Sequence, residues 1–176
     1  LICALPFSTK SNTLMRWHTY RLLPFTMGGA RALENAFTLA KWAEDNSIKG
    51  AFVECGVARG GTAGMLALTN KIYGNNDRSF WFFDSYEGLP NPTQDDFKDG
   101  KTGEFIRPLP KGSCLGTVEQ VEELLLTTLK LDSERINLIQ GWFQDTCAIH
   151  AKDVGKIALL RLDGDWYEST KIELEI

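Results

Sequence analysis

The feature that most restricts the fold is a short apolar run, AFVEC (51–55), that leads through the glycine-rich turn GVARGG into TAGMLALTNKIYG (62–74). Five mostly apolar residues are typical of a buried strand, and a largely apolar stretch closed by glycine is typical of a helix. A strand that passes directly into a helix indicates a βαβ unit, whose strands lie parallel and are covered on both faces. The sequence therefore predicts a parallel α/β fold.

The same alternation continues along the chain. Three further apolar runs predict strands, at 79–83, 136–140 and 157–162. Amphipathic periodicity predicts a helix over 29–46, and the capping-box pattern T-x-x-Q predicts another from Thr117. Since parallel strands are joined by right-handed crossovers, we expect a Rossmann-like doubly wound parallel sheet. Residues 1–176 would form a single domain, with a helical lead-in over 1–50.

Composition argues against several classes of partner. The chain carries a net charge of −4, so it has no basic surplus with which to hold a nucleic-acid backbone. No stretch approaches the about 20 apolar residues of a membrane helix. The 4 cysteines are scattered without a C-x-x-C pair, which favours reduced intracellular thiols over a zinc site. We therefore expect a cytoplasmic protein that binds neither nucleic acid nor membrane.

Acidic residues stand where three of the predicted strands end. Glu54 lies just before the glycine turn, Asp84 follows the second apolar run, and Asp163 follows the fourth, with Asp165 two residues further on. The carboxyl ends of parallel strands meet at one edge of the sheet, which is where such folds bind ligands. With Trp142 after the third run, these side chains are expected to converge on one crevice.

The glycine turn favours a nucleoside ligand with a cationic end. Gly56 and Gly60 allow a tight turn and a close backbone approach, but Ala58 breaks the dinucleotide pattern G-x-G-x-x-G. Glu54 would repel a pyrophosphate, whereas it suits the amino group or sulfonium of S-adenosylmethionine. Asp84 could accept hydrogen bonds from both hydroxyls of a ribose. The alternative is that the glycines only serve the turn and that the two acidic residues cap helices.

A polar stretch over 85–116 separates the second and third predicted strands, and it shows no periodicity. A loop of this length is more often a lid or a substrate gate than an idle connection. We expect it to cover the crevice, with the charged residues 95–101 forming a solvated face.

Five stretches of the sequence resemble the signatures of a known family. They are LPFTMGGARALENAFTLAKWAED, FVECGVARGG, FFDSYEGLP, GWFQDT and LLRLDGDWYEST, and together they span about residues 20–176. They resemble the macrocin O-methyltransferase family, whose members methylate sugar hydroxyls of natural products with S-adenosylmethionine and a magnesium ion. The resemblance implies an S-adenosylmethionine-dependent O-methyltransferase. Its acceptor would be a glycosylated or otherwise polyhydroxylated small molecule.

The resemblance also implies roles for individual residues. The cofactor would lie against Met27, Glu54, Gly56, Gly60, Asp84, Ser85, Gly141, Trp142 and Phe143. Asp163 would bind Mg²⁺, and Asp165 would be the general base that takes the proton of the acceptor hydroxyl. This division is chemically coherent, because a hard divalent cation prefers carboxylate oxygens and lowers the pKa of a bound hydroxyl. The plainer alternative for both aspartates is a cap on the helix that follows.

Two other functions stay open, and the end of the chain adds an expectation. The alternatives are a nicotinamide-dependent oxidoreductase and a non-catalytic nucleoside-binding domain. The chain stops at KIELEI within a helical stretch, before the fifth strand after which metal-dependent methyltransferases of this kind carry further acidic ligands. We therefore expect a fold truncated after its fourth strand, with weak magnesium binding and little methyl transfer. The exposed edge of the fourth strand would favour association into a homo-oligomer.

Overall fold

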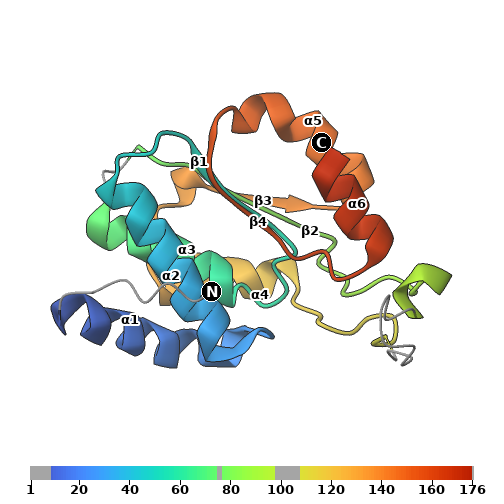
Figure 1. Cartoon of the computed structure of the whole chain (residues 1–176), viewed down its shortest axis with the longest axis horizontal. Helices are drawn as coiled ribbons and strands as arrows, with labels where there is room; N and C mark the ends of the chain where they lie inside the picture. The colour runs from blue at the N-terminus through green and yellow to red at the C-terminus, as the bar shows by residue number, and fades with distance from the viewer. Residues whose placement is uncertain (1–8, 75–76, 98–107, 176) are drawn as a thin grey trace.

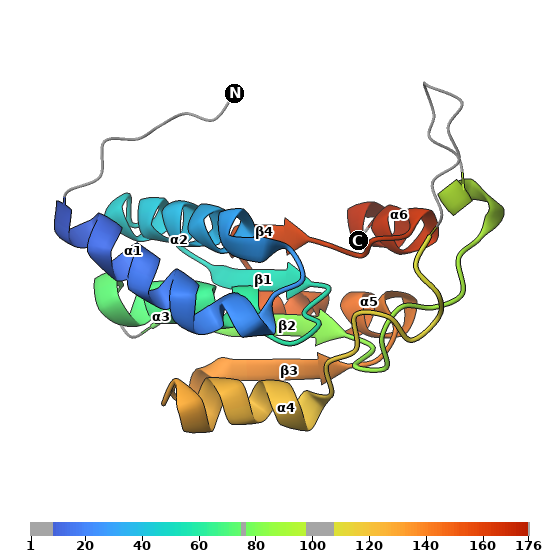
Figure 2. The same ribbon diagram turned by 90° about the horizontal axis from the view of Figure 1, so that it is seen from below.

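The computed structural model describes residues 9–74, 77–97 and 108–175, and within them four strands form one parallel sheet. The strands are β1 (Ala51–Cys55), β2 (Phe80–Asp84), β3 (Ile136–Gln140) and β4 (Ile157–Leu162). Their order is β3-β2-β1-β4 and all neighbours are parallel, so their carboxyl ends share one edge of the sheet (Figure 2). The Rossmann-like doubly wound sheet that the sequence predicts is confirmed.

Helices cover both faces of this sheet (Figure 1). On one face lie α1 (Thr9–Leu22), α2 (Gly29–Asp45), α3 (Gly61–Tyr73) and α4 (Val118–Glu122), and on the other α5 (Phe143–Val154) and α6 (Tyr167–Glu175). The first face carries the larger apolar core, which includes Phe52, Phe80 and Phe82. The second packs Val53 and Phe83 against α5. Within the described residues, no helix is both long and apolar enough to span a bilayer.

The helical elements differ from the predicted ones at two points. The capping box at Thr117 is present, since its Oγ1 accepts the N–H of Gln120 and its own N–H donates to Gln120 Oε1. The helix nevertheless continues as a π-helical segment, Glu123–Thr128. The sequence pattern does not predict α5, because Cys147 is its one buried residue and its apolar stripe is weak.

The second face of the sheet is less completely filled than the first. A cavity of about 210 Å³ lies between the sheet, α5 and α6, with mostly apolar walls and one charged lining residue, Glu173. Glu173 is buried without a well-placed hydrogen-bond partner in the described part of the chain, and burial raises its pKa to about 7. Beside the cavity, Ile157 and Leu160 of the edge strand β4 are 45% and 48% exposed. The homo-oligomer expected from this exposed edge stays a prediction.

The described parts of the long loop return to the carboxyl edge of the sheet. The N–H of Leu89 donates to the carbonyl of Ser113 at 2.8 Å, so the two arms of the loop run together. Asp96 accepts the N–H of Tyr167 at 2.8 Å and thereby caps the start of α6. The sequence predicts a wholly solvated face over 95–101, whereas the side chain of Asp96 is bonded to the start of α6. The middle of the predicted lid, 98–107, lies outside the described residues.

Candidate cofactor site

Four non-glycine residues with left-handed backbone conformation lie at the carboxyl edge of the sheet. They are Ala58 in the glycine turn, Tyr86 after β2, Cys114 in the returning loop and Asp165 after β4, with φ between 47° and 61°. Burial raises the pKa of Cys114, and the carboxylates of Asp165, Asp163 and Asp84 add to this effect, so this loop residue lies in the same neighbourhood. Left-handed non-glycine residues cost energy and concentrate at functional sites. This edge is therefore the candidate site.

The glycines of the turn between β1 and α3 are required by close contacts with the rest of the chain. Gly56 has φ +86°, and a Cβ placed on it would lie 2.2 Å from the carbonyl oxygen of Asp163. A Cβ on Gly61 would lie 2.7 Å from the carbonyl oxygen of Phe25. Gly60, with φ +82°, faces Val121. The turn is thus held between the segment after β4, the lead-in and α4, which brings segments far apart in sequence to one place.

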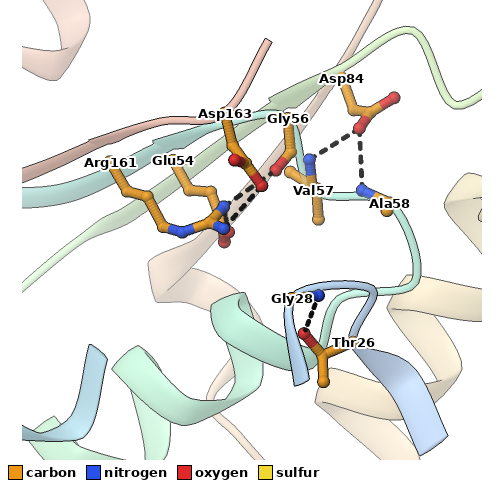
Figure 3. Close-up of polar contacts among 9 residues, drawn as sticks. All are labelled: Thr26, Gly28, Glu54, Gly56, Val57, Ala58, Asp84, Arg161 and Asp163. Atoms are coloured by element: carbon orange, nitrogen blue, oxygen red, sulfur yellow. Dashed lines mark hydrogen bonds and ion pairs between the residues drawn. The ribbon is translucent and has the colours of Figure 1, made fainter. Parts of the chain in front are cut away.

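Asp84 anchors the same turn. Its Oδ2 accepts the N–H groups of Val57 at 2.7 Å and Ala58 at 2.9 Å, as Figure 3 shows, and its Oδ1 accepts the N–H of Tyr86 at 2.7 Å. A carboxylate oxygen has about two acceptor sites, so Oδ2 is fully used. The second site of Oδ1 is reached by the hydroxyl of Ser85 at 3.4 Å, but the same hydroxyl also reaches a backbone carbonyl at 3.2 Å, and turning to that carbonyl would leave Oδ1 open to a ligand. The ribose role of Asp84 stays a prediction, and Oδ1 is the oxygen that could fulfil it.

Replacing Asp84 by alanine should affect both stability and cofactor binding. We expect a loss of roughly 1.5–3 kcal/mol in the free energy of unfolding, because three backbone N–H groups lose a charged acceptor. Binding of S-adenosylhomocysteine should weaken by a similar amount, roughly 1.5–3 kcal/mol, through the lost ribose contact. Urea denaturation and calorimetry measure the two effects separately.

Asp132→Ala is the matched control for this pair of measurements. Asp132 also accepts a backbone N–H, that of Glu134, at a helical turn before β3 and away from the crevice. It should lose stability and retain full affinity for S-adenosylhomocysteine. If a folded Asp84→Ala variant binds as tightly as the wild type, Asp84 is a turn anchor and has no part in the cofactor site.

Glu54 is the most deeply buried charged group at this edge, with 1% of the residue exposed. Its Oε1 accepts a hydrogen bond from Arg161 Nη1 at 2.7 Å, whereas its buried Oε2 has no hydrogen-bond partner among the described residues (Figure 3). Burial raises the pKa of Glu54 to about 8, against the opposing effect of Arg161. A buried carboxylate oxygen without a partner is costly unless a ligand supplies one.

Arg161 joins Glu54 to Asp163. Its Nη2 donates to Asp163 Oδ2 at 2.6 Å, so that one guanidinium spans both carboxylates. Burial alone would lower the pKa of Arg161, but the two negative partners raise it. Sequence reasoning missed this residue. The available signal was a basic residue inside the apolar run IALLRL, two positions before Asp163 and therefore on the same face of the strand.

Asp163 and Asp165 follow β4 with one residue between them, but they differ in surroundings. The side chain of Asp163 is 50% exposed and ion-paired with Arg161. Asp165 is exposed, and the surrounding protein together with the charges of Asp163 and Asp84 raises its pKa. The N–H of Tyr167 at the start of α6 donates to Asp96 rather than to either aspartate. The helix-capping alternative for the pair therefore loses its main support.

The remaining predicted residues surround the same edge. Gly141, with φ +142°, donates its N–H to the carbonyl of Asp84 at 2.9 Å, and Trp142 and Phe143 begin α5 directly after it. Ser85 is buried and donates its hydroxyl to the carbonyl of Gly88 at 3.2 Å. Met27 is 59% exposed on the short connection before α2, next to the segment that packs on Gly61. Their contacts with a cofactor stay predictions.

The chain resembles known methyltransferases along almost its whole length. Residues 10–176 match the profile of the family described as Macrocin-O-methyltransferase (TylF). Demethyldecarbamoylnovobiocin O-methyltransferase of Streptomyces niveus is 30% identical over 145 residues, which cover 82% of this chain and 53% of that protein. The 8-demethyl-8-(2,3-dimethoxy-alpha-L-rhamnosyl)-tetracenomycin-C 4'-O-methyltransferase of Streptomyces olivaceus is 31% identical, covering 85% and 56%. The chain thus spans just over half the length of these relatives.

Solved structures give the same picture of the fold. The O-methyltransferase NovP superposes with a TM-score of 0.69 at 30% identity, over 86% of this chain and 60% of that one. The calicheamicin methyltransferase CalS11 superposes with a TM-score of 0.65 at 22% identity, over 97% and 74%. The second match concerns the fold alone.

Proposed function

Because the chain belongs to the macrocin O-methyltransferase family, we propose that it is an S-adenosylmethionine-dependent O-methyltransferase acting on a hydroxyl of a sugar or another polyhydroxylated small molecule. The named substrates of two relatives are natural products, and one name specifies a rhamnosyl group. The site itself argues for the cofactor. No observation favours a nicotinamide cofactor, because the turn lacks the second glycine of G-x-G-x-x-G and is preceded by Glu54.

The observation that carries the proposal is the unpartnered Oε2 of Glu54. S-adenosylmethionine carries a positive amino group, and a buried carboxylate at the end of β1 is a suitable acceptor for it. The adjacent Asp84 Oδ1 is open to a ribose hydroxyl when Ser85 turns to its backbone carbonyl. The cationic end and the ribose of one ligand therefore have matching acceptors on neighbouring strands.

In the proposed reaction the protein's own residues orient the reactants and move one proton. When bound, S-adenosylmethionine supplies an electrophilic methyl group on a positively charged sulfur. Glu54 holds the amino-acid end of the cofactor and Asp84 its ribose, and Asp165 accepts the proton that the acceptor hydroxyl loses as its oxygen is methylated, with S-adenosylhomocysteine as the other product. The exposed position of Asp165 leaves it accessible to an acceptor that enters from solvent.

The family resemblance implies magnesium at Asp163, but the described residues do not fit a magnesium site by themselves. Mg²⁺ requires several oxygen ligands in near-octahedral geometry. Asp163 is already paired with Arg161 at 2.6 Å, and within the described part of the chain no group of three acidic, histidine or cysteine residues could hold a metal. We therefore derive no catalytic step through a metal, and weak magnesium binding by these residues stays a prediction.

The protonation of Glu54 predicts a pH-dependent affinity for the cofactor. Binding of a cationic amino group requires ionised Glu54, whose pKa is about 8 without ligand. Below that pH the protonated fraction must lose its proton, so affinity for S-adenosylhomocysteine should rise by up to about tenfold per unit between about pH 6 and 8. Calorimetry in buffers of different ionisation enthalpy should detect the released proton.

Two variants identify the titrating group. Glu54→Gln should bind S-adenosylhomocysteine more weakly and with an almost flat pH profile. Glu173→Gln tests the other carboxyl group with a pKa near neutrality, about 7; Glu173 lines the cavity on the other face of the sheet, and its carboxylate lies beside Gly164, between Asp163 and Asp165. The Glu173→Gln variant should keep the wild-type slope. A steep profile that survives in Glu54→Gln would assign the proton to another residue.

The proposed function is tested by titrating S-adenosylhomocysteine and NAD in parallel, followed by transfer assays with rhamnosylated and other glycosylated antibiotics. Saturable binding of S-adenosylhomocysteine without NAD binding is expected. Binding of NAD alone would contradict the proposal and favour the oxidoreductase alternative. Binding of S-adenosylhomocysteine with no transfer to any glycosylated acceptor would favour the non-catalytic alternative for these residues.

A further inference from the structure

Arg161 occupies a position from which it can control the geometry of the cofactor-binding carboxylate. In the pairing of β1 with β4, Arg161 lies directly beside Glu54, so both side chains project from the same face of the sheet. Its Nη1 contacts Glu54 Oε1 at 2.7 Å and the carbonyl oxygen of Gly56 at 3.4 Å. Its Nη2 contacts Asp163 at 2.6 Å. Three points around the glycine turn are thereby tied to one planar group.

This arrangement fixes which oxygen of Glu54 is available. The rigid fork of a guanidinium holds its partners in defined directions, unlike the freely rotating ammonium of lysine. With Oε1 engaged by Arg161, the buried Oε2 is the oxygen left for a ligand. The charges agree with this, because once Glu54 is ionised two carboxylates and one guanidinium leave a single negative charge to be balanced by one cationic group.

We propose that Arg161 is a positioning residue that presents Oε2 of Glu54 to the amino group of the methionine moiety of the cofactor. The inference rests on the proposed function, because it names how that site recognises one end of its ligand. Arg161 acts through Glu54 and need not contact the reacting atoms. Loss of Arg161 should therefore impair recognition of the amino-acid end of the ligand and spare recognition of its nucleoside end.

Two ligands separate these ends. S-adenosylhomocysteine carries the amino-acid moiety, and methylthioadenosine has the same adenosine and sulfur without it. In Arg161→Gln, affinity for S-adenosylhomocysteine should fall ten- to a hundredfold, while affinity for methylthioadenosine should stay within about twofold of the wild type. Arg161→Lys keeps the charge but cannot span both carboxylates, so it should lose a smaller factor for S-adenosylhomocysteine alone.

Arg59→Gln is the matched control, because Arg59 is an exposed arginine of the same turn whose Nε contacts the carbonyl of Leu115 at 3.4 Å. It should bind both ligands like the wild type. Equal losses for both ligands in the folded Arg161 variants would reduce Arg161 to a structural role and overturn the inference. Unchanged affinity for both would do the same. If Arg161→Gln does not fold, the comparison in Arg161→Lys decides.

The outcome for the wild type distinguishes the inference from the function on which it rests. A wild-type chain that binds neither ligand contradicts the proposed function and the inference with it. A wild-type chain that binds both, with variants that do not separate them, contradicts the role of Arg161 alone.

Discussion

Replacing Gly56 by alanine should cost about 2–5 kcal/mol in the free energy of unfolding, a large share of the stability of a domain this size. Two terms add. A left-handed conformation costs a residue with a side chain about 1–2 kcal/mol, and Gly56 has φ +86°. The new Cβ would lie 2.2 Å from the carbonyl oxygen of Asp163, so backbone must move, at a further cost of about 1–3 kcal/mol.

Gly112→Ala separates the two terms. Gly112 has nearly the same φ, +81°, but none of the described residues lies within 4 Å of the position its Cβ would take. The Gly112→Ala variant should lose only the conformational part of the free energy of unfolding, about 1–2 kcal/mol. Urea denaturation followed by circular dichroism measures both variants. Equal destabilisation of the two would mean that the contact between the turn and Asp163 is loose.

The same contact links stability to the site. Asp163 also donates its N–H to the carbonyl of Cys55 at 2.9 Å, so the segment after β4 is bonded to the last residue of β1, directly before Gly56. A displaced Asp163 would pull Arg161 away from Glu54. Any Gly56→Ala protein that remains folded should therefore bind S-adenosylhomocysteine more weakly than Gly112→Ala does.

The sheet could be predicted from the sequence because burial on both faces leaves a local mark. Strands such as Ala51–Cys55 and Ile136–Gln140 are short apolar runs next to turn residues, and they form where the pattern places them. Helix α5 leaves a weaker mark, since it covers the sheet with only Cys147 buried. Periodicity detects a helix in proportion to the stripe that it buries.

The site was predictable in location but not in its internal contacts. Strand topology alone brings Glu54, Asp84 and Asp163 to one edge of the sheet. The partners of these groups depend on side-chain geometry that no local pattern encodes: Asp84 bonds the turn through Oδ2, and Arg161 joins the other two carboxylates. The cap that Asp96 places on α6 crosses 71 positions of sequence, which no spacing rule could anticipate.

Replacing Asp165 by asparagine should lower the rate of methyl transfer by about a hundredfold to ten-thousandfold, the usual contribution of a general base. Asparagine keeps the shape of the side chain but cannot take a proton. The raised pKa of Asp165 makes it a stronger base than an ordinary aspartate. Since the ionised form is the active one, the wild-type rate should decline as the pH falls through that pKa.

The measurement compares the rate of the Asp165→Asn variant with that of the wild type, so it can be made even if turnover is slow. Transfer of tritium from methyl-labelled S-adenosylmethionine to a glycosylated acceptor gives the rate, and calorimetry gives the affinity for S-adenosylhomocysteine. Asp153→Asn, an exposed aspartate of α5, is the control and should leave both unchanged. A base at Asp165 requires the rate to fall while the affinity stays constant. If the affinity falls in step with the rate, Asp165 instead supports the cofactor-binding turn, and another group must accept the proton.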